Sequence, residues 1–219
     1  MPRLRSNPHS SRTGARTRPV RSVLRFVAAV MTLSGLLLVV DAGVTLAWQE
    51  PLSALTAGRE QATLERELAD PPRRVVERRP LRGDSIGRIA LPAIDRSYFM
   101  VEGTDTDTLR KGPGHYPKTP LPGEPGTVGI AGHRTTYGAP FRHIDRLDPG
   151  DRIVLEMPYA TFTYRVQRRR IVSATEVSVT DGVGYRRLIL SACHPLYSAA
   201  QRIVVFARQV ERGPARVRG

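Results

Sequence analysis

The hydrophobic pattern divides the chain into three regions. Residues 26–48 form an apolar run with a single charge, Asp41, and this run is long enough to cross a bilayer as a helix. Residues 53–70 carry apolar positions at helical spacing. From Asp84 onward, short β-branched and aliphatic runs alternate with Gly, Pro and Asp, which is typical of strands separated by turns.

The third region predicts a β-protein with few helices. Many short strands separated by turn signals favour an all-β barrel or sandwich, and only brief helices fit between them. The expected strands cover residues 86–94, 98–103, 127–132, 152–157, 161–174, 187–193 and 202–210, and the expected helices lie near 106–111 and 140–147.

The middle region is expected to be a helix followed by an extended linker. Ser53 can cap a helix over 53–70, in which Leu64 and Leu68 stand four residues apart and charged side chains form a solvated face. The Pro- and Arg-rich residues 71–83 predict an extended linker. We interpret the two segments together as a juxtamembrane spacer.

Charge before the apolar run predicts its orientation. Residues 1–25 hold seven Arg and no acidic residue, without an apolar period, and are expected to be a disordered basic tail. Basic residues gather on the cytoplasmic side of membrane helices, so we expect a single-pass protein with a cytoplasmic N-terminus and everything after residue 48 outside. A cleaved signal peptide, with a weak cleavage site at 45–47, is the alternative.

Composition removes several classes of function. The formal net charge of +14 divides into +7 for residues 1–25, −1 for the span and +8 for residues 49–219. No zinc-finger, helix-turn-helix or RNP-type aromatic pattern accompanies this charge, so nucleic-acid binding is not expected. The lone cysteine excludes an intramolecular disulfide framework and any zinc site of two or four cysteines.

Cys193 ends an apolar run that predicts a strand, which would place the thiol at a rim of the barrel. A buried structural role is the common interpretation of an isolated cysteine. Outside the cytoplasm, however, an unpaired cysteine faces oxidation and is therefore a candidate reactive thiol. Such a thiol needs a nearby cation or histidine to become a nucleophile.

Four histidines are candidates for that partner. His133 follows a run of small residues whose two glycines leave room for a substrate or a facing backbone. His194 adjoins the cysteine, and neighbours in an extended chain point to opposite faces, so it is the weaker candidate. His143 lies in a predicted helical stretch and suits a surface or packing role, whereas His115 lies in a Gly/Pro loop and stays ambiguous.

Arg202 opens the last predicted strand, nine residues after Cys193. If the two strands are neighbours, its guanidinium would stand beside the thiol, where it could hold an oxyanion or a substrate carbonyl. The alternative is a solvated arginine at a strand end, the common case in a chain with 32 arginines.

These motifs resemble the sortase family, the membrane-anchored cysteine transpeptidases of Gram-positive cell surfaces. The resemblance covers about residues 84–210 and is specific in combination. It rests on the run AGHRTTYGAPF at 131–141, the Cys193-His194-Pro195 strand end and the Gln201-Arg202 strand start, with support from Tyr116-Pro117 and from residues 121–126. The combination is similar to class E sortases of high-G+C Actinobacteria, with which the excess of Arg over Lys is consistent.

One departure from the family pattern precedes the cysteine. Sortases usually read T-L-x-T-C there, whereas residues 189–193 read ILSAC, with Ile189 and Ala192 in place of both threonines. The loss of the hydroxyl next to Cys193 puts substrate preference and rate in doubt more than reaction type.

The resemblance implies an eight-stranded sortase β-barrel with short helices and a catalytic set of Cys193, His133 and Arg202. Cys193 would attack the Thr–Gly carbonyl of a C-terminal LPXTG or, for class E, LAXTG sorting signal. Arg202 would stabilise the oxyanion or hold the peptide, and His133 would protonate the leaving amine. Tyr116 and Tyr137 are expected to line the substrate groove.

The resemblance also implies the partners. The thioacyl intermediate would pass to an amine of a lipid-linked peptidoglycan precursor, so the expected partners are surface proteins bearing a sorting signal, this precursor and the membrane. The scheme needs no metal or other cofactor, and no dense carboxylate cluster argues for calcium.

We therefore expect five segments: a cytoplasmic basic tail (1–25), a transmembrane anchor (26–48), a juxtamembrane helix and linker (49–83), a catalytic domain (84–212) and a C-terminal tail (213–219). Two other functions remain open. One is another extracytoplasmic cysteine enzyme such as an L,D-transpeptidase, although the residues around Cys193 do not match that family's motif. The other is a non-enzymatic anchored module with a structural cysteine.

Overall fold

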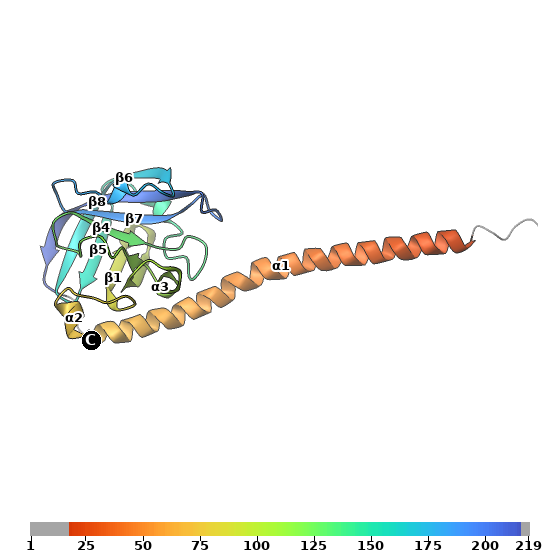
Figure 1. Ribbon diagram of the computed structural model, residues 1–219, viewed down its shortest axis with the longest axis horizontal. Coiled ribbons are helices and arrows are strands. Elements are labelled where there is room, and N and C mark those ends of the chain that lie inside the picture. The colour runs from red at the N-terminus through yellow and green to blue at the C-terminus, as the bar shows by residue number, and fades with distance from the viewer. Residues whose placement is uncertain (1–17, 216–219) are drawn as a thin grey trace, which may run out of the picture. The chain divides into compact units, whose positions relative to one another are not determined.

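The computed structural model describes residues 18–215, so residues 1–17 and 216–219 of the predicted tails lie outside the described residues. Helix α1 spans Arg18–Ala69 (Figure 1). The expected helix start at Ser53 is wrong, because that residue lies inside α1. The chain divides into two compact units, residues 1–48 and residues 49–219.

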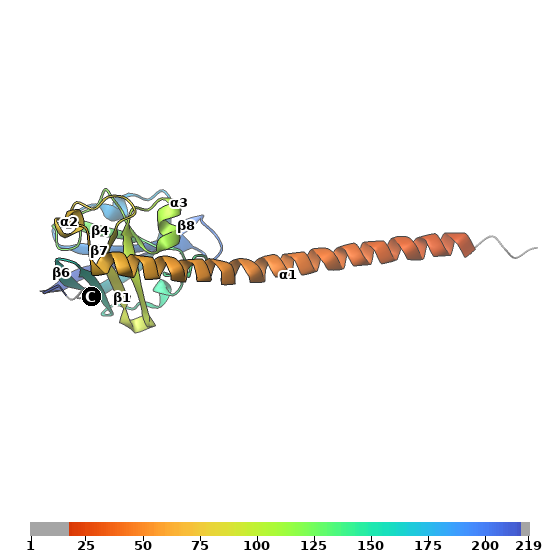
Figure 2. The same cartoon turned by 90° about the horizontal axis from the view of Figure 1, so that it is seen from below.

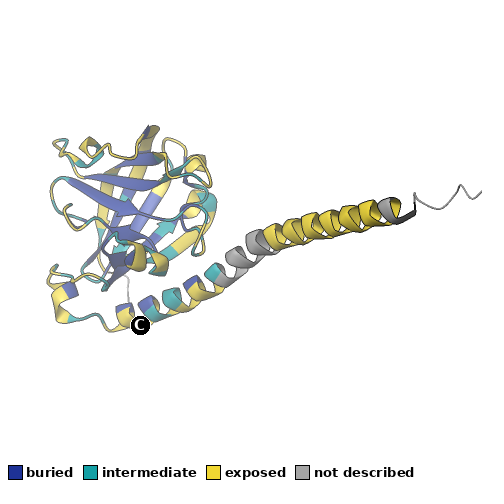
Figure 3. Ribbon diagram, turned by 45° about the vertical axis from the view of Figure 1, so that its right-hand side comes forward, coloured by how far each residue is buried: buried dark blue, intermediate teal, exposed yellow. Residues whose placement is uncertain are grey.

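In the first unit, α1 carries the apolar stretch Arg21–Gly43, which is long and apolar enough to cross a membrane. Its side chains are exposed along the whole stretch (Figure 3). A continuous apolar surface of this length is unfavourable in water. These features are consistent with a membrane span, and a signal sequence near an N-terminus shares them.

The second unit contains a closed barrel of eight strands, which confirms the predicted all-β barrel (Figure 1). The order around the barrel is β1-β2-β3-β4-β7-β8-β6-β5, and only the pairs β2–β3 and β4–β7 are parallel. The strands are β1 Ser85–Leu91, β2 Arg96–Glu102, β3 Gly114–His115, β4 Thr127–Ala131, β5 Arg152–Met157, β6 Ala160–Ser173, β7 Arg187–His194 and β8 Gln201–Gly213.

The short helices differ partly from expectation. Helix α3 (Thr106–Lys111) lies where it was predicted, whereas the stretch 140–147 contains only the 3-10 turn η2 (Ile144–Arg146). The segment 71–83 is not fully extended, because it contains the short helix α2 (Arg73–Val76). Val75 of α2 is buried in the main core, and burial of this apolar side chain favours the helical turn over an extended segment. Two further 3-10 turns are η1 (Pro92–Ile94) and η3 (Ser178–Thr180).

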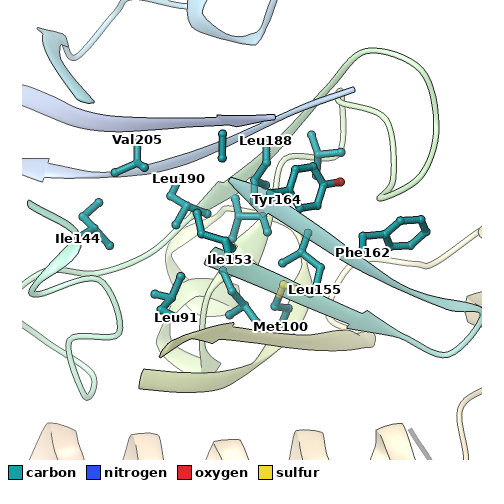
Figure 4. Close-up of a cluster of buried hydrophobic side chains, with 14 of the residues drawn as sticks. Leu91, Met100, Ile144, Ile153, Leu155, Phe162, Tyr164, Leu188, Leu190 and Val205 are labelled. Atoms are coloured by element: carbon teal, nitrogen blue, oxygen red, sulfur yellow. The ribbon is translucent and has the colours of Figure 1, made fainter. Parts of the chain in front are cut away.

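The core fills the barrel with side chains from the inward faces of every strand except the two-residue β3 (Figure 4). On β7, Leu188, Leu190 and Ala192 belong to this core. Because side chains alternate along a strand, Ile189 and Cys193 lie on the outward face. Ile189 packs there in a second, smaller cluster with Val172, Val204 and Phe206.

The last part of α1, within the second unit, packs on the barrel (Figure 2). Leu64 and Leu68 are each 1% exposed. The side-chain amide of Gln61 accepts a hydrogen bond from the Phe99 N–H at 2.7 Å and donates to the carbonyls of Phe99 at 3.0 Å and Lys111 at 2.8 Å. The helix is therefore tied to β2 and α3 as well as packed against them.

Candidate active site

Cys193 lies directly opposite Arg202 in the antiparallel β7–β8 ladder. Directly opposite residues in such a ladder have Cβ atoms about 4.5–5.5 Å apart. Ser191 and Val204, two residues earlier on β7 and two later on β8, form the next pair on the same face. The two strands are thus neighbours, which meets the condition for Arg202 to stand beside the thiol, and both residues share one face at the same end of the barrel.

His133 lies at this same end because β4 runs parallel to β7. Ala131 pairs with Ser191, and the Gly132 N–H donates to the Ser191 carbonyl at 3.0 Å. His133 and Cys193 therefore each follow this paired position by two residues. The parallel register brings together two residues that lie 60 positions apart in the sequence.

The His133 ring is half-buried, and its centroid lies 5.1 Å from that of Tyr137. Burial, followed by the charge of Arg110, lowers the pKa of His133 from its ordinary value, which favours the neutral imidazole. Within residues 18–215, buried Nε2 of His133 has no hydrogen-bond partner. A neutral ring with a free nitrogen can accept a proton from a thiol.

The loop after His133 holds an unusual backbone. Tyr137, Gly138 and Ala139 are consecutive residues in the left-handed region, with φ of 51°, 73° and 43°. Such non-glycine conformations are strained and persist only where the surroundings hold them. The Phe141 N–H closes the loop by donating to the His133 carbonyl at 2.9 Å.

A cavity of about 500 Å³ opens beside this site on the outward face of β7 and β8. Its floor includes Ile189, Ser191, Arg202 and Val204. One wall comes from the segment 116–119 between β3 and β4, and the other comes from the loop between β6 and β7. The cavity is largely apolar, has room for a peptide segment, and includes Arg202, the ladder partner of Cys193.

Arg202 is half-buried and contributes to this cavity. Its Nη1 donates to the carbonyls of Ala199 and Gln201, both at 2.9 Å. These bonds tie the guanidinium to the turn between β7 and β8. Arg202 is therefore held at the cavity rather than extended into solvent as a free strand-end residue.

The two tyrosines expected at a groove lie in different places. Tyr116 lines the cavity, and its ring packs on Gly129, where an added Cβ would lie 2.6 Å from the ring. Tyr137 packs against His133 and lies under Arg110, whose guanidinium carbon is 5.5 Å from the ring centroid. The room expected at the two glycines is occupied by side chains, because Phe141 covers Gly132 as Tyr116 covers Gly129.

His115 supports the wall that contains Tyr116. Its Nδ1 lies 2.8 Å from a carboxylate oxygen of Glu102, and its Nε2 lies 3.1 Å from both the Pro120 carbonyl and the Thr119 hydroxyl. Thr119 in turn donates to the Tyr116 carbonyl at 2.8 Å. The ambiguous His115 is thus a buried structural residue of this wall, and its partner Glu102 gave no signal in the sequence.

Arg134 is the main site residue that the sequence reasoning missed. It is 4% exposed, lies next to His133 in the chain and pairs with Asp145 at 3.1 Å. Its Nη1 also lies 3.5 Å from the Cys193 carbonyl and 3.2 Å from Nδ1 of His194. Its place beside His133 was the available signal, but nothing in the spacing pointed toward the β7 strand end.

Metal ligation was not expected from the sequence. Over residues 18–215, no group of three or more His, Cys, Asp or Glu side chains could hold a metal ion.

Comparisons with known proteins agree with this architecture. A family model described as "Sortase domain" matches residues 89–210. The chain is 31% identical over 155 residues to Sortase D of Bacillus subtilis, covering 69% of this chain and 77% of the relative. It is 29% identical over 206 residues to Sortase SrtE1 of Streptomyces coelicolor, covering 87% of this chain and 58% of that relative.

Solved structures give the same result. Sortase E1 from Streptomyces coelicolor, with a tripeptide in its active site, superposes with a TM-score of 0.57 at 32% identity, covering 59% of this chain and 90% of that one. Sortase E from Streptomyces avermitilis gives a TM-score of 0.58 at 31% identity, with coverages of 62% and 93%.

The chain therefore belongs to the sortase family. It is an enzyme of the transpeptidase type, and its affinity is to the sortase E enzymes.

Proposed function

We propose that Cys193, His133 and Arg202 are the catalytic residues of a sortase that joins a protein bearing a C-terminal sorting signal to an amine of a cell-wall precursor. The observation that carries this proposal is the pairing of Cys193 with Arg202 at a cavity, at the barrel end where His133 also lies. The signal is of the LAXTG or LPXTG type.

In the first half-reaction, the thiol of Cys193 gives its proton to neutral His133 and attacks the carbonyl carbon of the Thr–Gly bond. Arg202 donates hydrogen bonds to the oxyanion that forms. The C–N bond then breaks, and His133 returns the proton to the departing glycine amine. The acyl part of the substrate stays on the sulfur as a thioester.

In the second half-reaction, an amine of the acceptor attacks the thioester carbon. His133 takes the proton from the attacking nitrogen, a new amide bond forms, and the thiolate leaves and is reprotonated. The thioester retains most of the free energy of the cleaved peptide bond, so ligation outside the cell requires no ATP. An acceptor on a lipid-linked peptidoglycan precursor fits this scheme.

We propose further that residues 26–48 anchor the protein in the cell membrane with the N-terminus in the cytoplasm and the catalytic unit outside. The seven arginines before the span and the exposed apolar stretch of α1 support this topology. An anchor of this kind would keep the enzyme close to substrates that are themselves held at the membrane. The catalytic domain is proposed to cover residues 84–212.

The test uses the full chain in detergent with LAXTG and LPXTG peptides and a glycine-based amine, analysed by mass spectrometry. Wild-type protein should release the fragment after threonine and form the amine ligation product. Cys193→Ala, His133→Asn and Arg202→Gln should lose both products, whereas His143→Gln, a histidine away from the cavity, should keep them. Wild-type protein that processes neither peptide would contradict the proposal.

A further inference from the structure

The loop between β6 and β7 forms one wall of the cavity and has little regular secondary structure. Residues 174–186 contain a single regular element, the 3-10 turn η3. Six of these residues line the cavity: Ala174, Thr175, Glu176, Val177, Val179 and Thr180. Hydrogen bonds inside the loop, such as those from the Thr180 N–H and hydroxyl to the Val177 carbonyl, close its turns. The position of the wall against the barrel depends in addition on contacts from outside the loop.

Arg187, the first residue of β7, holds this loop through hydrogen bonds to its backbone. Its side chain is buried, with the residue 6% exposed, and its Nη2 donates to the carbonyls of Val179 at 2.9 Å and Asp181 at 2.7 Å. Its Nε donates to the hydroxyl of Thr127 at 3.1 Å. That hydroxyl donates in turn to the Asp181 carbonyl at 2.8 Å, so three hydrogen bonds from Arg187 and Thr127 reach the loop.

Because Arg187 is charged and buried, the loss of these hydrogen bonds would be costly. Among the described residues it takes part in no salt bridge, and its guanidinium carbon lies 5.4 Å from the ring centroid of Phe206. A buried cation is strongly unfavourable unless its donors are satisfied. Here two loop carbonyls accept hydrogen bonds from Nη2 and the Thr127 hydroxyl accepts one from Nε. The loop therefore helps to compensate the burial of the charge, and the charge in turn holds the loop in place.

We infer that Arg187 is a positioning residue that sets the cavity wall and thereby the affinity for the sorting peptide. This inference rests on the proposed function, because it takes the cavity as the peptide site. Arg187 is not among the residues that line the cavity, so it would not touch a peptide bound there. It acts through the carbonyls of Val179 and Asp181.

Because Arg187 lies far from Cys193, its substitution should affect peptide binding without affecting the chemical step. Arg187 lies six residues before Cys193 on β7, which corresponds to about 20 Å along an extended strand. Loss of the wall should therefore raise KM for the peptide and leave kcat and the alkylation rate of Cys193 nearly unchanged. A purely structural role would instead lower kcat, the alkylation rate and the melting temperature together.

The chain offers a matched control in the adjacent arginine. Arg186 carries the same charge but is exposed, and its Nε donates to the Gly123 carbonyl. We compare Arg187→Lys, Arg187→Met and Thr127→Val with Arg186→Lys and Arg186→Met in the full-length protein. Lysine can keep one loop carbonyl but not the fork of two donors, and Thr127→Val removes the hydroxyl at nearly constant volume.

Two readouts, KM for the peptide and amide hydrogen exchange in the loop, decide the inference. Arg187→Met should raise KM for the peptide by about tenfold or more, the size expected for one lost charge-assisted hydrogen bond, and Arg187→Lys by less. Amide hydrogen exchange at residues 177–181 should accelerate in the Arg187 and Thr127 variants and not in the Arg186 variants. This exchange needs no substrate, so it tests the loop contact even if the protein turns over no peptide.

The inference is wrong if the Arg187 variants match the Arg186 variants in KM and in loop exchange, or if kcat falls as much as KM rises. If Arg187→Met does not fold, Thr127→Val and Arg187→Lys test the same contacts. Wild-type protein that is inactive on every peptide contradicts the proposed function instead, and this outcome is distinct from unchanged loop exchange.

Discussion

The guanidinium of Arg134 lies 3.2 Å from Nδ1 of His194, the residue that follows the proposed nucleophile. Because arginine only donates, Nδ1 of His194 must accept, and a neutral His194 therefore carries its proton on Nε2. Arg134 thus joins the loop that begins at His133 to the strand end at Cys193. This contact favours a role for His194 as a fixed hydrogen-bond acceptor of Arg134, not as the group that carries the proton in the reaction.

The first prediction concerns this link. Arg134→Gln removes the charge pair with Asp145 and weakens the contacts to Cys193 and His194. Small misplacements of catalytic groups cost up to about a hundredfold in rate, so we expect kcat to fall by about 10–100-fold with a smaller change in KM. Steady-state kinetics measures both. Arg146→Gln, at an exposed neighbouring arginine, is the control and should behave as wild type.

The second prediction concerns pH. The pKa of His133 is lowered first by burial and second by the charge of Arg110. If neutral His133 takes the thiol proton, activity is lost as pH falls through this pKa. Arg110→Gln removes a repelling charge, raises the pKa of His133 and should move the acid limb of the kcat/KM profile to higher pH. Arg110→Lys keeps the charge, so the acid limb of its kcat/KM profile should coincide with that of the wild-type protein. Identical profiles for all three proteins would argue against this role of His133.

The third prediction concerns the departure from the family motif at Ala192. This residue is 3% exposed and packs in the main core, so restoring threonine there adds volume and a hydroxyl to a filled interior. We expect Ala192→Thr to lower the free energy of unfolding by about 1–3 kcal/mol in denaturant titrations. Ala192→Val is the control, because valine has nearly the same shape as threonine but no hydroxyl. A threonine variant clearly more stable than the valine variant would show that the hydroxyl finds a partner.

The fourth prediction concerns the end of α1. Leu64 is 1% exposed against the barrel, whereas Leu55 on the same helix is 66% exposed. Leu64→Ala should destabilise the second unit by about 2–5 kcal/mol, as expected for a deleted core leucine. Leu55→Ala should change stability by less than about 0.5 kcal/mol. Equal effects of the two substitutions in thermal or denaturant unfolding would mean that this helix does not stabilise the barrel.

Much of the barrel could be predicted because its strands are long enough to show a pattern. The expected strand at 152–157 coincides with β5, and the turn after it joins β5 to β6 through the pair Met157 and Ala160. Strand β3 was missed because it has two residues, too few for any period. The extent of α1 was also missed, because a cap at Ser53 is plausible locally and the helix continues through it.

The arrangement around the site depended on pairings that no local pattern encodes. The proximity of Cys193 and Arg202 requires only that two strands consecutive in the sequence pair, a possibility visible in the sequence, whereas the approach of His133 requires the parallel β4–β7 register. The supporting contacts of Arg134 and Arg187 lie 60 positions away in sequence, at the His194 ring and the Thr127 hydroxyl. Such contacts involve ordinary arginines in an arginine-rich chain, so the sequence could not distinguish them.

The most direct test of the account is the covalent intermediate on Cys193. The full-length protein is incubated with an LAXTG peptide without an amine, quenched in acid and analysed by intact mass and peptide mapping. We predict a mass increase equal to the acyl fragment ending in threonine, located on Cys193, and its discharge when a glycine-based amine is added. Turnover of the peptide with no adduct on Cys193, or with an adduct on another residue, would contradict the account.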